Sequence, residues 1–156
     1  MTEAQTETQT EHTPSRRANH ALIVGGSSGI GLATGRILLE RGGRVTLVGR
    51  NPEKLAAAVA SLAPLGPVDT VHTVRADLHD ADDVQRLMDL IASREQPFTQ
   101  LVNAAGTFSP KPFLEHTAKD YDAYLGLNKA LFFITRAVAR RMSGAGGGAI
   151  VNIGSM

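Results

Sequence analysis

The chain has 156 residues, of which 42% are hydrophobic and 20% charged, and its formal net charge is +1. This composition is typical of one globular domain, and the near-neutral charge argues against a nucleic-acid partner. Cysteine is absent, which excludes disulfides and thiolate metal sites, and no apolar run reaches the ~18 residues that a membrane span requires. We therefore expect a cytoplasmic protein without a membrane partner.

The amino-terminal segment, residues 1–19, is rich in Thr, Glu and Gln and has almost no apolar side chains. Such a segment cannot offset the entropy of ordering, so we predict a disordered tail. From residue 20 onward, short apolar runs alternate with stretches of helical period, which is typical of βαβ units. One domain is therefore expected over residues 20–156.

The first unit is a strand at residues 21–24 that leads through a glycine-rich turn into a helix, which Gly42 and Gly43 end. The apolar residues expected to share the buried face of this helix are Ile30, Ala33, Ile37 and Leu38.

A second strand, residues 45–48, precedes a helix that starts at Asn51, Pro52 and Glu53. These residue types suit the cap, the first helical position and the positive helix end. The expected inner residues of this helix are Leu55, Val59 and Leu62.

The third unit is a strand near residues 70–74 and a helix with three aspartates, Asp80, Asp82 and Asp83, in its first turn. Its expected apolar stripe consists of Val84, Leu87, Met88 and Ile91.

The last strands are predicted at residues 100–103 and 149–153, on either side of a long helix over residues 117–142. Thr117 and Asp120 have the spacing of a capping box at the start of this helix. Right-handed crossovers would arrange the five strands in the order 3-2-1-4-5. We therefore predict an α/β fold, a Rossmann-type doubly wound parallel sheet truncated after the fifth strand, which leaves that apolar strand as an uncovered edge.

The glycine-rich turn, VGGSSGIG at residues 24–31, places glycines at positions 25, 29 and 31 between a strand and a helix. In that setting a diphosphate can approach the backbone N–H groups of the helix N-terminus. The structural alternative is that these glycines serve only a tight turn and close helix packing.

At these residues the sequence resembles the short-chain dehydrogenase/reductase family, whose turn is Thr-Gly-x-x-x-Gly-x-Gly. Gly25, Gly29 and Gly31 match that spacing, while Val24 stands where the family has threonine. Further segments are similar in the family's order: ADLHD at residues 76–80 and NAAG at residues 103–106, with Ala104 replacing an asparagine.

The resemblance implies catalytic roles for Asn128 and Ser155. The cofactor contacts that it implies come from Gly25, Ser27, Ser28, Gly29, Ile30, Gly31, Arg50, Asp77, Leu78, Asn103, Ala105 and Gly106. Asp77 and Asn128 also have structural alternatives. Asp77 can be an ordinary turn residue, and Asn128 can make a purely structural hydrogen bond to a neighbouring strand. We expect Asn128 on a buried stripe of the helix with Tyr121, Tyr124, Leu125, Phe132 and Thr135.

The cofactor choice depends on the end of the second strand, where NAD enzymes of this fold commonly carry an acid. Here Gly49 and Arg50 occupy that place, and Ser27 or Ser28 adds a hydroxyl donor. An arginine can bind a 2′-phosphate bidentately, so NADP is expected, with NAD as the alternative. The other reading is that Arg50 pairs with Glu53 on the surface.

The proton donor implied by the resemblance, a Tyr-x-x-x-Lys motif, is absent from the 156 residues. Tyr121 is followed at the fourth position by Leu125, and Tyr124 by Asn128. We therefore expect the amino-terminal part of a longer, oligomeric enzyme for a small carbonyl or alcohol substrate, inactive and prone to self-association as given.

Two alternatives remain open, a non-catalytic NADP-binding module and an unrelated interaction protein on the same fold. The histidines, His12, His20, His72, His79 and His116, have no metal-binding spacing, so no metal is expected.

Overall fold

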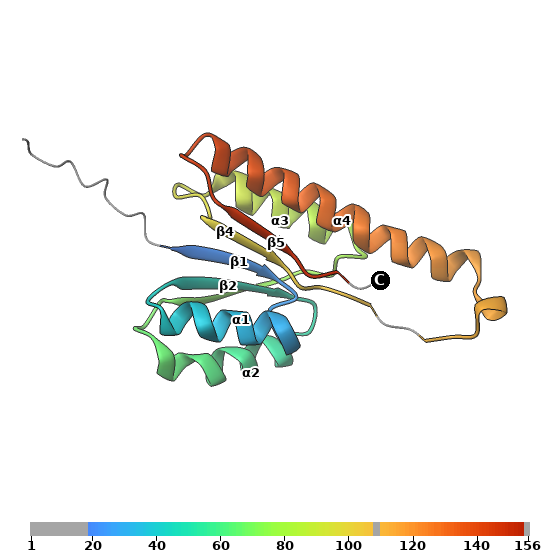
Figure 1. Cartoon of the computed structure of the whole chain (residues 1–156), viewed down its shortest axis with the longest axis horizontal. Coiled ribbons are helices and arrows are strands. Elements are labelled where there is room, and N and C mark those ends of the chain that lie inside the picture. Colours follow the sequence, from blue (N-terminus) through green and yellow to red (C-terminus); the bar gives the residue numbers. More distant parts are fainter. Residues whose placement is uncertain (1–18, 108–109, 155–156) are drawn as a thin grey trace, which may run out of the picture.

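A computed structural model describes residues 19–107 and 110–154 of the chain. The predicted tail, apart from Asn19, and the predicted catalytic Ser155 lie outside the described residues. The described elements form three layers, with a parallel sheet between two pairs of helices (Figure 1).

The sheet has five parallel strands in the order β3-β2-β1-β4-β5, which confirms the predicted topology. In the register of the three inner strands, Val24 of β1 lies opposite Val48 of β2 and Asn103 of β4. The carboxyl ends of these strands are therefore level, and the loops that follow them meet at one edge. The strands are β1 His20–Val24, β2 Arg44–Gly49, β3 Val71–Arg75, β4 Gln100–Asn103 and β5 Ala149–Asn152.

Helices α1 (Gly29–Glu40) and α2 (Pro52–Leu62) cover one face of the sheet, and α3 (Ala81–Ser93) and α4 (Ala118–Ser143) cover the other (Figure 1). Alternate residues of β1 serve the two faces: Ala21 and Ile23 belong to the core with α1 and α2, and Leu22 and Val24 to the core with α3 and α4. Two short 3-10 helices, η1 (Ala63–Leu65) and η2 (Phe113–Glu115), lie in the connections.

Side chains cap the starts of α2, α3 and α4; the caps of α2 and α4 were predicted, whereas Asp80 was expected in the first turn of α3 and is its N-cap instead. The Asn51 side chain accepts a hydrogen bond from the Lys54 N–H (2.8 Å), and the Asp80 side chain accepts from the N–H groups of Asp82 and Asp83. Thr117 and Asp120 form the expected capping box. The starts of α2, α3 and α4 are therefore fixed by local sequence.

The predicted inner face of α1 is wrong. The buried residues are Gly31, Gly35 and Leu39, whereas Ile30 is 59% exposed and Ile37 47% exposed. A Cβ at Gly35 would lie only 3.4 Å from the Ile23 side chain, so the helix axis approaches the sheet through its glycines. Apolar periodicity missed this face because glycine carries no hydrophobic signal. The other two residues predicted for this face are half-buried (Leu38) and exposed (Ala33). In α2, the predicted Leu55 and Leu62 are buried, but the third buried residue is Ala58, and the predicted Val59 is only half-buried.

The stripe of α4 predicted to be buried is also wrong. Asn128 is exposed, and Tyr121 and Phe132 are each 64% exposed. The buried stripe consists instead of Ala130, Ile134, Val138 and Met142. The physical reason is visible in Figure 1, where the amino-terminal turns of α4 extend past the ends of the strands and only the later turns pack on α3 and the sheet.

Candidate functional site

A cleft of about 490 Å³ lies at the carboxyl ends of β1, β2, β3 and β4. It brings together most of the predicted cofactor residues: Gly25, Ser27, Ser28, Gly29, Ile30, Arg50, Asp77, Leu78, Ala105 and Gly106. Gly31 and Asn103, which were also predicted, are buried and do not line it. Segments from four different βα connections therefore meet around one space, as expected for a ligand site of a doubly wound sheet.

The glycines of the turn have two distinct roles. Gly25 has φ +84°, and a Cβ there would lie 2.5 Å from the Ala105 backbone nitrogen, so this glycine lets the turn contact the loop after β4. A Cβ at Gly31 would collide with the Gly25 carbonyl oxygen. Both positions therefore fit the close-packing alternative. Gly29 does not, because a Cβ there would lie in open space; its φ of +53° fits a tight turn.

The start of α1 differs from the starts of the other helices. Ser28 is its N-cap residue, yet the Ser28 side chain makes no capping hydrogen bond, and the first turn contains no acidic residue. Within the described residues, the other three α-helices each have a side-chain cap and an acid in the first turn. The partial positive charge of the α1 N-terminus is thus left uncompensated where it faces the cleft, which suits an anion.

The end of β2 supplies positive charge to the cleft. Arg50 and Lys54 both line it and are exposed, and the half-buried Ser27 and Asn51 line it beside them. In the part of the chain that the structure describes, Arg50 makes no ion pair with Glu53, so its charge is available to a ligand. A Cβ at Gly49 would lie 3.0 Å from Ser27 Oγ, which leaves little room there for an acidic side chain.

Lys54 was missed by sequence reasoning, which identified Asn51 and Glu53 only as helix-start residues. The available signal was a second cation close to Arg50, in the first turn of the helix that follows β2.

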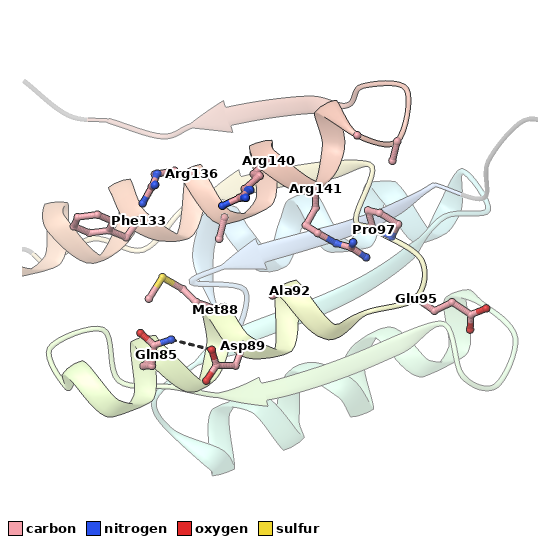
Figure 2. A pocket seen from close by; sticks show the side chains of 13 residues that line it. Gln85, Met88, Asp89, Ala92, Glu95, Pro97, Phe133, Arg136, Arg140 and Arg141 are labelled. Atoms are coloured by element: carbon pink, nitrogen blue, oxygen red, sulfur yellow. Dashed lines mark hydrogen bonds between the residues drawn. The ribbon is translucent and has the colours of Figure 1, made fainter.

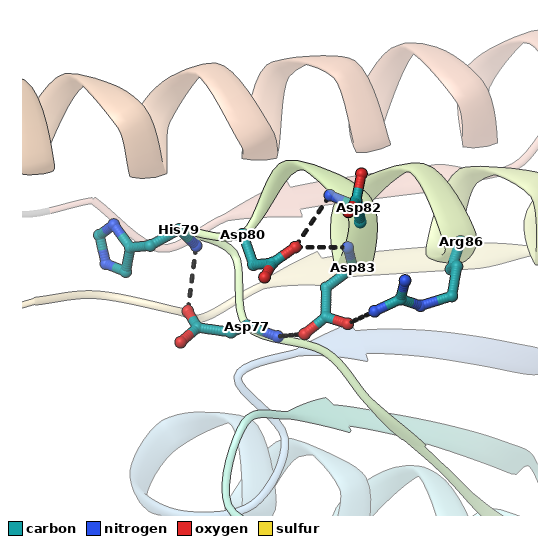
Figure 3. A network of polar contacts seen from close by, with 6 residues as sticks. All are labelled: Asp77, His79, Asp80, Asp82, Asp83 and Arg86. Atoms are coloured by element: carbon teal, nitrogen blue, oxygen red, sulfur yellow. Dashed lines mark hydrogen bonds and ion pairs between the residues drawn. The ribbon is translucent and has the colours of Figure 1, made fainter.

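Asp77, Leu78 and His79 form the wall that follows β3. The Asp77 carboxylate accepts a hydrogen bond from the His79 N–H (3.0 Å), and the Asp77 N–H donates to Asp83 Oδ2 (2.8 Å) (Figure 3). Asp77 is therefore both a turn residue and a cleft residue. His79 lines the cleft and was not predicted.

Asn103 lies beneath the wall formed by the loop after β4. It is 2% exposed, and its Nδ2 donates to Thr135 Oγ1 (2.8 Å) and Asn152 Oδ1 (2.7 Å). The side chain thus joins β4 to α4 and β5. These hydrogen bonds fix Asn103, and the next residues, Ala104, Ala105 and Gly106, line the cleft.

Of the two predicted catalytic residues, the structure describes only Asn128. Asn128 lies on the exposed side of α4 and does not line the cleft, although its neighbour Leu127 does. Ser155 lies outside the described residues, which continue past β5 with the Ile153 N–H donating to the Asn103 carbonyl (2.8 Å).

A larger groove of about 670 Å³ lies between α3 and α4 (Figure 2). Its lining includes Arg136, Arg140 and Arg141 together with Phe133 and Met88. It contains none of the predicted site residues and no helix N-terminus. Despite its larger volume, it is not the candidate site.

Two further searches of the described ranges gave negative results. No helix there is long and apolar enough to cross a membrane. No group of three or more His, Asp or Glu side chains, among residues 19–107 and 110–154, is placed to hold a metal ion.

Comparison with known proteins gives consistent matches. A family model described as short chain dehydrogenase matches residues 19–156. The chain is 38% identical over 140 residues to gluconate 5-dehydrogenase of Gluconobacter oxydans, covering 87% of this chain and 53% of that protein. The chain spans about half the length of the curated relatives that it matches.

Solved structures of similar chains include two with a bound nucleotide. A short-chain dehydrogenase from Sphingobium yanoikuyae in complex with NADPH has a TM-score of 0.81 and 34% identity, covering 88% of this chain and 54% of that one. L-Sorbose reductase from Gluconobacter frateurii, complexed with NADPH and L-sorbose, has a TM-score of 0.78 and 31% identity, covering 86% of this chain and 51% of that one.

Proposed function

The chain belongs to the short-chain dehydrogenase family, and on that premise we propose that its cleft binds NADP(H) as the nucleotide-binding part of an oxidoreductase. The proposal rests above all on one observation. The uncapped N-terminus of α1 faces a cleft in which Gly29 leaves open space. A diphosphate placed there would accept hydrogen bonds from free backbone N–H groups and lie at the positive helix end.

The remaining cleft residues fit the other parts of the dinucleotide. Asp77 and Leu78 would contact the adenine, and Ala105 and Gly106 the part of the cofactor beyond the diphosphate. Arg50 would hold the 2′-phosphate, with Ser27 beside it and Lys54 as a second cation. The two nucleotide complexes described above both contain NADPH, as does a third similar structure, an actinorhodin polyketide ketoreductase, which supports NADP over NAD.

For the chemistry, we propose reduction of a small carbonyl compound or oxidation of the corresponding alcohol. The nicotinamide, when bound, supplies or accepts the hydride, and protein residues orient the substrate and handle the proton. Ser155 and Asn128 are the proposed catalytic residues of this chain. No Tyr-x-x-x-Lys is present in the sequence, and loss of a positioned acid typically lowers rates by ~10²- to 10⁴-fold. We therefore expect these residues to bind NADPH with little or no turnover.

The test is calorimetric titration of the folded chain with NADPH and NADH, using two glycine variants. Gly29→Val places a side chain in the cleft at a residue with φ +53°. Gly42→Val is the matched control, because Gly42 has φ +77°, also faces open space and lies at the other end of α1. We expect Gly29→Val to weaken NADPH binding by about tenfold or more and Gly42→Val to leave it unchanged at equal cost in stability.

Three outcomes separate the candidate functions. A folded wild-type chain that stays empty at millimolar NADPH and NADH would overturn the proposal and favour an interaction protein. Binding without NADPH oxidation across a panel of ketones is expected here, and it also fits a non-catalytic NADP-binding module. Oxidation at the rate of an intact family member would refute the predicted loss of activity.

A further inference from the structure

The cleft wall formed by Asp77, Leu78 and His79 has no regular secondary structure of its own that would fix it. It lies between the end of β3 and the start of α3, and its residues are half-buried or exposed. It is held by the Ala76 N–H, which donates to the Gly49 carbonyl, and by the packing of Leu78 against the core. Between them, the Asp77 N–H is held by a hydrogen-bond network outside the cleft. Figure 3 shows this network.

The central group of this network is the carboxylate of Asp83, in the first turn of α3. Asp83 is 8% exposed and does not line the cleft. Its Oδ2 accepts the hydrogen bond from the Asp77 N–H (2.8 Å), and its Oδ1 pairs with the Arg86 guanidinium. The Asp83 N–H is in turn held by Asp80 Oδ1 (3.0 Å). The carboxylate is thus fixed on the helix and reaches back to the wall.

The charge state of Asp83 agrees with this geometry. The hydrogen bond from the Asp77 backbone, followed by that from Arg86, lowers the pKa of Asp83 below its usual range. The group is therefore an ionised acceptor at neutral pH, and hydrogen bonds to ionised acceptors are stronger than neutral ones.

We infer that Asp83 is a positioning residue for nucleotide binding, which sets the cleft wall of Asp77, Leu78 and His79 through the Asp77 backbone N–H. This inference rests on the proposed function. Its consequence is that a side chain outside the cleft controls affinity for the adenosine part of the dinucleotide. The three-aspartate start of α3 has divided roles: Asp80 caps the helix, and Asp83 reaches the wall, whereas the exposed Asp82 carboxylate points away from this network in Figure 3.

The experiment measures binding of adenosine 2′,5′-bisphosphate and NADPH at a temperature where circular dichroism shows every variant folded. Asp83→Leu removes the acceptor and should weaken both ligands by about tenfold, the size expected for a lost hydrogen bond to a charged group. Asp83→Asn keeps an oxygen acceptor and should restore affinity to within about threefold of wild type. Asp82→Leu removes a first-turn charge of the same helix, and Arg86→Met removes only the ion pair; both should bind within about twofold of wild type.

Affinity and stability then distinguish the outcomes. Asp83→Leu with a lower melting temperature and wild-type affinity would overturn the inference, because Asp83 would serve the fold alone. Asp82→Leu weakening binding as much as Asp83→Leu would also overturn it, since helix-end charge would then explain the effect. A wild-type chain that binds neither ligand would instead refute the proposed function.

If Asp83→Leu does not fold, the wild-type chain still provides a test through amide hydrogen exchange. The Asp77 amide should be protected in the free protein, and adenosine 2′,5′-bisphosphate should increase its protection together with that of Leu78 and His79. An Asp77 amide that exchanges as fast as an exposed loop amide, with or without the nucleotide, would overturn the inference.

Discussion

Two single residues, Arg50 and Lys54, place positive charges four positions apart in the chain at the cleft that Ser27 also lines. Arginine offers a planar donor fork, and lysine a point charge on a flexible stem. Both are exposed, so each keeps its hydration until a ligand arrives. Their joint presence favours a ligand with a doubly charged phosphate over one with ribose hydroxyls alone.

This arrangement makes the cofactor preference testable by titration. Arg50→Ala should weaken NADPH binding by about tenfold, and Lys54→Ala by several-fold, because each removes a charge-assisted contact to the 2′-phosphate. NADH affinity should stay within about twofold, since NADH has no such phosphate. Arg41→Ala is the control, because Arg41 is exposed at the far end of α1. Unchanged NADPH affinity in Arg50→Ala would argue against the NADP assignment.

His20, at the start of β1, is a buried histidine that lies close to positively charged side chains. Burial first, and then the nearby charges of Arg94, His72 and Arg44, lower the pKa of His20 to about 4. The ring Nδ1 accepts from Arg94 Nη2 (3.1 Å), and Nε2 lies 2.9 Å from Thr46 Oγ1 on β2. The neutral ring therefore joins β1 to β2 and to the connection after α3.

Protonation of His20 is expected to destabilise this junction. Because the folded pKa of about 4 lies below the unfolded value near 6.5, the unfolded chain binds more protons in between. Stability should be full above about pH 6.5 and fall as the pH drops toward 4. The melting temperature of His20→Gln should depend less on pH over this window, whereas the exposed control His116→Gln, which is not among the groups that shift the pKa of His20, should follow the wild type. Parallel pH profiles for wild type and His20→Gln would contradict the prediction.

At the scale of elements, sequence reasoning succeeded where a signal is local. The caps at Asn51, Asp80 and Thr117 each lie within three residues of the N–H groups that they bind. Those at Asn51 and Thr117 were predicted, whereas Asp80 was expected inside the first turn of α3. The glycine turn was predicted because its signal is local too. The strand order also followed from chain-level rules, because right-handed parallel crossovers leave few alternatives.

The predictions that failed for helices and strands concern which face of a helix is buried and which residues lie near the cleft. Both depend on tertiary packing. The inner face of α1 is set by Gly31 and Gly35, which have no hydrophobic signal. The apolar residues of the first half of α4 were assigned to a core that the described residues do not form. Asp83 was predicted only as a first-turn residue and Lys54 was missed, because their distance from the cleft depends on how α2 and α3 sit on the sheet.

In the molecule as a whole, two apolar surfaces are exposed, one on β5 and one on the first half of α4. β5 is the last strand of the sheet, with Ile150 37% and Val151 49% exposed. On α4, Tyr121, Tyr124 and Phe132 are exposed as well. An apolar sheet edge offers unpaired backbone groups to other chains. The predicted uncovered edge is therefore confirmed within the described residues.

We expect the 156-residue chain to self-associate because of these surfaces. Gel filtration over a range of concentrations should show a mass above that of a monomer, and Val151→Lys should lower it by placing a charge on the edge strand. Val68→Lys is the control, because Val68 is 90% exposed in the connection between α2 and β3. A sharp monomeric peak with a cooperative melt for the wild type would contradict the prediction.

The backbone contact between Gly25 and Ala105 has a consequence for biosynthesis. The glycine turn emerges early from the ribosome, but the segment that abuts it is synthesised 80 residues later, as the positions 25 and 105 show. A nascent chain that ends before β4 thus has the nucleotide-binding sequence without its second wall. Translation must therefore pass residue 105 before the cleft is complete, so a ligand that needs both walls can bind only after β4 has been synthesised.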